Sequence, residues 1–277
     1  MRILRWTAAC AAGVMASSLL LTQPASAAPE VTPPPVGARF DYQIGGAYDV
    51  PNGVRVVSRD WQADPARGLY NIAYVNAMQA QPGRGVGSHP WFARQAPELL
   101  LKRNGQFVVD GGWGETLLDI STPAKRQRLV DLQKPWLDEI AKRGFQAVEP
   151  DNQDSFLRSR GRLSKSDAWA YLTLFTQAAH ERGLAVAQKN NAEYTDIGKN
   201  QIGFDFAIAE ECAIWNECGD YIDAYGRNVI SIEYRDQSAS AFRRSVSRYG
   251  DQISLVRRDR GVSPRGAGGY FYQTGNN

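Results

Sequence analysis

From Phe40 onward, short apolar runs of strand length alternate with longer segments whose apolar residues recur at helical spacing. This alternation is typical of βα units built around a parallel sheet. Several runs are apolar almost throughout, as expected of strands buried on both faces. Eight strands are predicted, over residues 40–44, 54–60, 69–76, 145–151, 184–189, 204–210, 229–233 and 253–257.

Three helices between these strands carry end signals. Thr122 and Pro123 are suited to the N-cap and first position of a helix that stops at Gly144. Ser164 and Asp167 resemble a capping box, and that helix is expected to end at Gly183. The third helix covers residues 238–249.

The connections between the first three strands are too short for ordinary crossover helices. The pattern therefore predicts an α/β fold, a (β/α)8 TIM barrel that is irregular in its first units. Residues 39–277 are expected to form a single TIM-barrel domain of about 240 residues, the usual size of such a barrel.

Polar residues gather where the predicted strands end. Asp41 lies in the first strand, and at or near the ends of the others lie Asp60, Asn76, Asp151, Lys189, Asn190, Glu210, Glu233, Arg257 and Arg258. Barrel enzymes keep their sites at this end of the strands. A doubly wound sheet also binds ligands there, but no strand is followed by GxGxxG or GxxxxGK[ST]. The glycine-rich residues 83–87 are expected to form a loop that leads to no helix.

Two of these strand ends match each other. Residues 144–154 (GFQAVEPDNQD) and 203–212 (GFDFAIAEEC) both pass from Gly-Phe through apolar residues to clustered acids. Two carboxylates are the equipment of a glycosidase, and Asp151 and Glu210 would face each other across a barrel mouth. Alternatively, Asp151 caps the following segment, and Glu210 and Glu211 form ion pairs with nearby cations.

Other catalytic groups are scarce. The two histidines, His89 and His180, have no zinc-binding spacing and suit no catalytic triad, and GxSxG is absent. His180 is expected to be structural, and no metal is expected. Trp61, Trp113 and Trp215 lie in presumed βα loops, where they could stack on a sugar ring or simply pack.

The first 27 residues have an Arg-bearing start, an apolar middle and Ala-Ser-Ala at 25–27, which predicts a signal peptide. An uncleaved anchor is the alternative, but the apolar run is short for a span. Removal of residues 1–27 takes Arg2 and Arg5 away, so the formal charge of the chain falls from +3 to +1. This charge gives no support for nucleic-acid or membrane binding. Residues 28–38 are expected to be a Pro-rich linker outside the fold.

Cysteine usage agrees with export. Cys10 leaves with the signal peptide, so Cys212 and Cys218 remain in a chain bound for an oxidising compartment. A disulfide between them is predicted, directly after the second acidic cluster. Two reduced cysteines are the alternative.

Several motifs resemble glycoside hydrolase family 114, the endo-α-1,4-polygalactosaminidases. The resemblance covers residues 40–234 and is carried by FDYQIGGAYD, YVNAMQAQPG, GETLLDIS, GFQAVEPDNQDS, AVAQKNN, DFAIAEECAIWNEC and ISIEY. It implies a (β/α)8 barrel, an extracellular location, no cofactor and hydrolysis of α-1,4-linked galactosamine polymers. It also implies that Asp151 and Glu210 are the acidic pair, although Glu211 could take the place of Glu210. Gln146 stands where the family commonly has Asp.

The sequence thus predicts a secreted, monomeric, endo-acting and retaining hydrolase, with Asp151 as nucleophile and Glu210 as acid/base. Its partner would be a cationic galactosamine-containing glycan, attracted by the local field of the acids. The expected substrate contacts are Asp41, Asp60, Asn76, Trp113, Asn152, Lys189, Asn190, Glu211 and Glu233. An exo-acting α-galactosidase-like hydrolase and a non-catalytic carbohydrate-binding barrel of the cell envelope are the alternatives.

Overall fold

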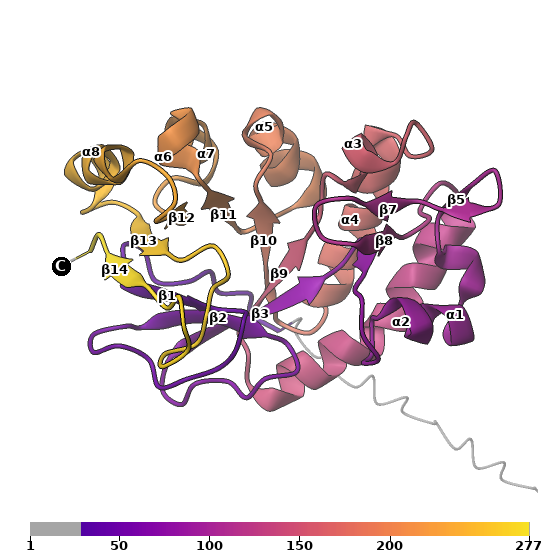
Figure 1. Cartoon of the computed structure of the whole chain (residues 1–277), viewed down its shortest axis with the longest axis horizontal. Helices are drawn as coiled ribbons and strands as arrows, with labels where there is room; N and C mark the ends of the chain where they lie inside the picture. The colour runs from indigo at the N-terminus through magenta and orange to yellow at the C-terminus, as the bar shows by residue number, and fades with distance from the viewer. Residues whose placement is uncertain (1–28, 277) are drawn as a thin grey trace, which may run out of the picture.

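The computed structural model describes residues 29–276. Its centre is a sheet of eight parallel strands that curves into a barrel, with helices outside it (Figure 1). The strands are β1 (Phe40–Gln43), β2 (Val56–Asp60), β3 (Tyr70–Asn76), β9 (Ala147–Asp151), β10 (Ala185–Lys189), β11 (Phe206–Glu210), β12 (Val229–Tyr234) and β13 (Ser254–Arg258). All eight predicted strands are confirmed, and β14 (Tyr272–Thr274) is added antiparallel to β13. The predicted signal peptide lies outside the described residues.

The barrel closes between β1 and β13 through side chains. Arg258 donates to the Asp41 carboxylate at 3.0 Å and to the backbone carbonyl of Tyr42. The hydroxyl of Tyr272 adds a bond to the backbone carbonyl of Phe40 at 3.3 Å. Because no backbone ladder joins β1 to β13 within residues 29–276, these side chains form the seam of the barrel.

The three predicted helices are present. Helix α2 (Pro123–Arg143) begins at the Thr122 cap and ends at Gly144, whose left-handed φ of 91° glycine adopts without a Cβ penalty. Helix α4 (Lys165–His180) has the full capping box of Ser164 and Asp167, but it ends three residues before Gly183. Helix α8 (Ala239–Tyr249) is the third. Shorter helices are α1 (His89–Gln95), η1 (Pro97–Leu99), α3 (Ser155–Arg158), η2 (Ala192–Tyr194), α5 (Thr195–Ile197), η3 (Gly198–Ile202), α6 (Cys212–Trp215) and α7 (Cys218–Tyr225).

The first units are irregular, as expected, because loops alone join β1, β2 and β3. A large insertion follows β3, and its small strands are β4 (Gln79–Ala80), β5 (Lys102–Arg103), β6 (Gln106–Phe107), β7 (Val109–Asp110) and β8 (Glu115–Leu117). Strands β4, β8 and β7 pair into a separate sheet. The glycine-rich residues 83–87 are a loop, but the expectation that no helix follows is wrong, because Ser88 caps α1.

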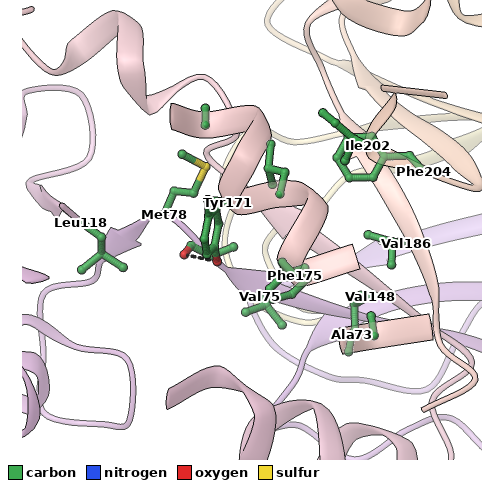
Figure 2. Close-up of a cluster of buried hydrophobic side chains, with 14 of the residues drawn as sticks. Ala73, Val75, Met78, Leu118, Val148, Tyr171, Phe175, Val186, Ile202 and Phe204 are labelled. Atoms are coloured by element: carbon green, nitrogen blue, oxygen red, sulfur yellow. Dashed lines mark hydrogen bonds between the residues drawn. The ribbon is translucent and has the colours of Figure 1, made fainter. Parts of the chain in front are cut away.

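Two apolar clusters follow from the alternation of side chains along each strand. Ala147 and Phe206 point into the barrel with the inner cluster. Val148 and Val186 point outward, against Phe175 of α4 (Figure 2). This phase directs residues 149 and 151 of β9, 189 of β10 and 210 of β11 toward the barrel interior.

The Pro-rich segment does not stand clear of the barrel. Val31 packs against the inner cluster, and the Tyr70 hydroxyl donates to the Thr32 carbonyl at 2.6 Å. Pro34 is buried. The described part of the predicted linker therefore covers the end of the barrel where the strands begin. Among residues 29–276, no helix has the length and apolar character needed to cross a bilayer.

Candidate active site

A cavity of about 540 Å³ lies where the barrel strands end. Predicted site residues that line it are Asp60, Trp113, Asp151, Asn152, Lys189, Asn190, Glu210 and Glu211. Lining residues that sequence reasoning missed include Tyr42, Tyr74, Asp110, Glu115, Asp154, Arg158, Tyr234 and Arg260. The structure therefore gathers most of the predicted residues at one mouth.

Asp151 is the last residue of β9 and accepts two hydrogen bonds. The Tyr74 hydroxyl and the backbone N–H of Asn152 each donate to its carboxylate at 2.8 Å. Burial alone would raise the pKa of Asp151, but Lys189, Tyr74 and Asn152 together lower it below its ordinary value. Asp151 is thus held as an anion at the edge of the cavity, the state that a nucleophile needs.

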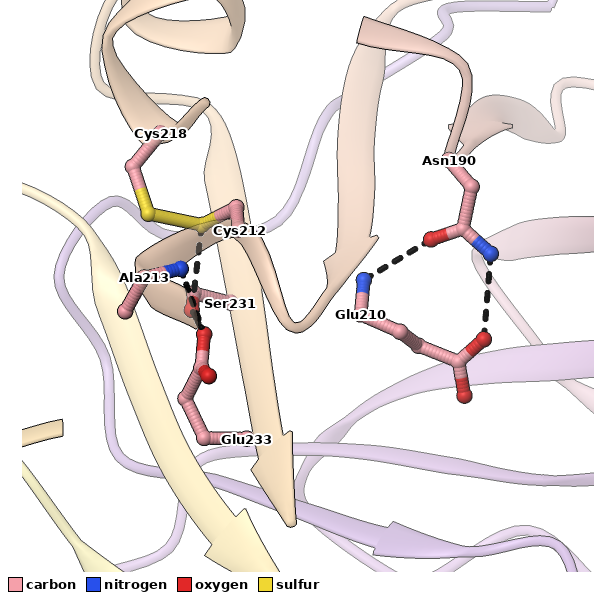
Figure 3. Close-up of a disulfide and its surroundings, with 7 residues drawn as sticks. All are labelled: Asn190, Glu210, Cys212, Ala213, Cys218, Ser231 and Glu233. Carbon is pink, nitrogen blue, oxygen red and sulfur yellow. Dashed lines mark hydrogen bonds between the residues drawn. A yellow bond between two sulfur atoms is a disulfide. The ribbon is translucent and has the colours of Figure 1, made fainter. Parts of the chain in front are cut away.

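Glu210, the last residue of β11, is fixed by the neighbouring strand end. Asn190 donates to its carboxylate at 3.0 Å and accepts from its backbone N–H at 2.8 Å (Figure 3). The Tyr234 hydroxyl donates to the other carboxylate oxygen. The Arg260 guanidinium stacks over the Tyr234 ring, 4.4 Å from its centroid. The orientation of Glu210 therefore depends on direct contacts from Asn190 and Tyr234, and Arg260 packs on the second of these.

Lys189 lies between the two acids. Its ammonium nitrogen is 3.4 Å from an Asp151 oxygen and 3.7 Å from a Glu210 oxygen. Because both oxygens contact one nitrogen, they lie no more than about 7 Å apart, a limit that covers the carboxylate separation of retaining enzymes and only the lower end of the range for inverting ones. Lys189 is almost fully buried, so its charge acts in a medium that screens it weakly.

The structure separates Glu210 from Glu211. Glu211 follows the strand with a left-handed φ of 63°, and its carboxylate pairs with Arg260 at 2.5 Å. Asn152 after β9 and Asn190 after β10 have the same left-handed backbone, with φ of 63° and 55°. Each chain segment therefore turns sharply as it leaves its strand, at the rim of the cavity.

Glu115 is the most informative of the missed residues. Asn76 donates to its carboxylate at 2.7 Å and Asn152 at 3.3 Å, and burial raises its pKa. Asp110, from the same β7–β8 hairpin, pairs with Arg158 at 2.6 Å. The sequence could have indicated both acids, because they lie on either side of Trp113, a predicted substrate contact, in the segment DGGWGE.

Three predicted contacts do not line the cavity. Asp41 belongs to the barrel seam, and Asn76 lies behind Glu115. Glu233 points out of the barrel, where it accepts from the backbone N–H of Ala213 at 2.9 Å and from Ser231 at 3.1 Å. Figure 3 shows it as part of a cluster separate from Glu210. Glu233 faces outward because its strand neighbours Ile232 and Tyr234 face inward.

Of the tryptophans that the sequence placed in βα loops, Trp113 lines the cavity, and Trp61 and Trp215 do not. Trp113 is 69% exposed at the cavity, whereas Trp61 stacks on Trp136 with centroids 5.6 Å apart. Trp215 is exposed but does not line the cavity. His180 makes a hydrogen bond with Asp205 at 2.8 Å, in keeping with a structural role.

The structure contains the disulfide between Cys212 and Cys218, which joins the start of α6 to the start of α7. Within residues 29–276, Cys212, Cys218 and Glu233 are the group whose donor atoms lie close enough to hold a metal ion. Since the two sulfurs are bonded to each other, they do not offer the thiolates that a metal requires.

Comparison with known proteins decides the family. The glycoside-hydrolase family GH114 matches residues 21–276. The chain belongs to this family. It is therefore a glycoside hydrolase with a TIM-barrel fold, and the family resemblance inferred from its motifs is confirmed.

Two solved structures share the fold. Ega3 of Aspergillus fumigatus, in complex with galactosamine, superposes with a TM-score of 0.66 at 19% identity, covering 92% of this chain and 99% of that one. The glycoside hydrolase domain of PelA from Pseudomonas aeruginosa has a TM-score of 0.54 at 14% identity, covering 83% and 96%. No curated protein matches the chain.

Proposed function

We propose that this GH114 member is a secreted, endo-acting and retaining hydrolase of α-1,4-linked galactosamine polymers, with Asp151 as nucleophile and Glu210 as acid/base. The observation that carries the proposal is the placement of both carboxylates in one cavity, on either side of the Lys189 ammonium. Members of the rival class, carbohydrate-binding barrels without activity, would not need two such acids.

The contacts suit a two-step displacement. Asp151, kept ionised by Lys189 and Tyr74, attacks the anomeric carbon while Glu210 protonates the leaving glycosidic oxygen. A water molecule then replaces the leaving sugar, and Glu210 removes its proton as the water cleaves the bond to Asp151. Tyr234 and Asn190 hold Glu210 in place for both proton transfers.

The cavity walls support a cationic glycan as substrate. Its lining includes seven acids and three cations, so negative charge is in excess there. Beyond the catalytic pair the acids are Asp60, Asp110, Glu115, Asp154 and Glu211, and the cations are Arg158, Lys189 and Arg260. Carboxylates that share a cavity concentrate ligand amines there, although the whole chain is close to neutral. Trp113 offers an exposed face to a sugar ring. Ega3 is a structural relative that binds galactosamine, which supports the same sugar as the substrate unit of the present chain.

The catalytic pair can be tested by two isosteric substitutions. Asp151→Asn and Glu210→Gln should each lower the rate of reducing-end release from deacetylated galactosaminoglycan by several orders of magnitude, with unchanged circular dichroism. Glu211→Gln should cost about 10²-fold or less, as expected of a positioning group. Near-wild-type activity of either catalytic variant would overturn the assignment.

The stereochemistry and product lengths test the rest of the proposal. NMR of the first products should show the substrate's anomeric configuration, and early digests should contain a range of oligomers. Products of inverted configuration would show that Asp151 acts as a general base that activates water, and not as a nucleophile. Release of single sugars alone would favour the exo-acting alternative.

Secretion has a test of its own. Protein recovered from the culture medium should begin near Ala28 by intact-mass measurement, and its mass should report the bonded cysteines before reduction. A chain that retains residues 1–27 and stays with the cells would reject secretion.

A further inference from the structure

Glu149 is a carboxylate that the proposed chemistry does not use. It lies in β9 two residues before Asp151 and points into the barrel, where it is fully buried. Tyr42 donates to one of its oxygens at 2.9 Å and Ser58 to the other at 2.6 Å. Lys189 donates to the first oxygen at 2.9 Å. Because none of its surface is exposed, Glu149 cannot touch a substrate.

Burying this carboxylate is costly, so its partners are informative. Burial raises the pKa of Glu149, and the Lys189 ammonium is the main opposing influence. Lys189 in turn loses hydration on burial, yet its pKa is raised well above its ordinary value by Asp151, Glu149 and Glu210. One buried cation is therefore shared by three carboxylates, and the contact with Glu149 is the shortest of the three.

We propose that Glu149 is a positioning residue that fixes the Lys189 ammonium between the two catalytic carboxylates and neutralises part of its charge. The inference rests on the proposed function of Asp151 and Glu210. Lys189 must keep Asp151 ionised, but its full charge would also favour loss of the proton that Glu210 has to donate. Glu149 weakens the pull on Glu210, while Asp151 keeps its additional bonds from Tyr74 and Asn152.

The other groups that face this centre do not compete for the role. Lys189 is approached by Tyr42 from β1 and Tyr74 from β3, and Tyr234 from β12 reaches Glu210. Burial raises the pKa of each of these tyrosines well above its ordinary value, so all three stay neutral in the working range. Ser58 from β2 carries no charge. Of the charged groups nearby, Glu115 acts on Asp151, and Arg260 pairs with Glu211 and stacks on Tyr234. The carboxylates of β9 and β11 are therefore the groups that balance Lys189.

The test is the pH profile of kcat for the full chain acting on deacetylated galactosaminoglycan. Glu149→Gln should move both limbs of the profile to lower pH, the alkaline limb by about one unit or more, because Glu210 then loses its proton more readily. Ser58→Ala, which removes a bond to the same carboxylate and keeps its charge, should leave both limbs in place. Since a purely structural role changes amplitude alone, lower kcat with unmoved limbs would overturn the inference, and so would an equal shift in Ser58→Ala.

A second pair of variants keeps the test decisive if Glu149→Gln does not fold. Glu149→Met removes the charge with a side chain of similar length and should move both limbs to lower pH, whereas Glu149→Asp keeps the charge and should leave both limbs in place. Unmoved limbs in Glu149→Met, or equal shifts in the two variants, would contradict the role of Glu149. Activity in Asp151→Asn or Glu210→Gln would instead reject the catalytic assignment itself, so the two failures are distinguishable.

Discussion

Glu210, Glu211 and Glu233 come from two neighbouring strands, yet their carboxylates have three different surroundings. Glu210 faces the cavity, Glu211 lies on a left-handed turn beside Arg260, and Glu233 lies outside the barrel near the disulfide. The difference follows from position along the chain, because consecutive residues of a strand point to opposite faces. Residue type alone could not distinguish an acid at the mouth from one behind the sheet.

Glu233 provides a prediction about stability. Burial raises its pKa to about 7, and one carboxylate oxygen has no hydrogen-bond partner among residues 29–276. The folded state therefore favours the protonated acid, so stability should be full below about pH 4.5 and should fall as the pH rises through 7. Glu233→Gln removes this loss and should gain up to about 3 kcal/mol at pH 8.

Urea unfolding at pH 4 and pH 8 measures this gain. Glu139→Gln, a change at a half-exposed carboxylate of α2 that lies 4.0 Å from Lys142, is the control and should alter the unfolding free energy by less than about 0.5 kcal/mol at either pH. An advantage of Glu233→Gln that is equal at both pH values would contradict a titrating carboxylate.

The barrel strands and the long helices could be predicted from the sequence, because short stretches of sequence determine them. The strands were found from apolar runs, and α2 and α4 from the caps at Thr122 and Ser164. The β7–β8 hairpin was not found, because its strands are two and three residues long and become ordered through pairing with β4. Glu115 was missed for the same reason, since it reaches the cavity only after the hairpin has folded back.

The same hairpin carries a prediction about substrate binding. Trp113 is exposed at the cavity, so Trp113→Ala should raise KM about 10-fold through loss of stacking worth roughly 1 kcal/mol or more, with little change in kcat. Trp215→Ala removes a similarly exposed ring from outside the cavity and should leave KM unchanged. Steady-state kinetics on galactosamine oligomers compare the two, and equal effects would show that Trp113 has no special contact.

The whole molecule depends on how the barrel closes. Arg258 and Asp41 are both fully buried at the seam between β1 and β13. The prediction that Asp41 contacts substrate was wrong. The sequence places Asp41 in a strand, but it does not tell that this strand lies next to β13 when the barrel closes. Removing the Asp41 carboxylate leaves the buried Arg258 with Asp259, 3.4 Å away, as its remaining carboxylate partner, so the charge of Arg258 is then only partly compensated.

Asp41→Asn should therefore lower the free energy of unfolding by about 3 kcal/mol, the lower end of the cost of breaking a buried pair. Asp138→Asn breaks the pair with Arg182 on the outside of the protein and should cost less than about 1 kcal/mol. Chemical denaturation of both variants measures the difference. Similar losses would show that the seam is held by packing rather than by this pair.

The left-handed turns that follow β9, β10 and β11 have a consequence for the evolution of the site. Asn152 and Asn190 suit this backbone, whereas Glu211 occupies it at a cost of about 1 kcal/mol. In a library randomised at these positions, selection for folding alone should enrich Gly, Asn and Asp and deplete Val and Ile. Glu should persist at 211 only under selection for activity, so sequencing both pools would separate what the backbone permits there from what the enzyme requires.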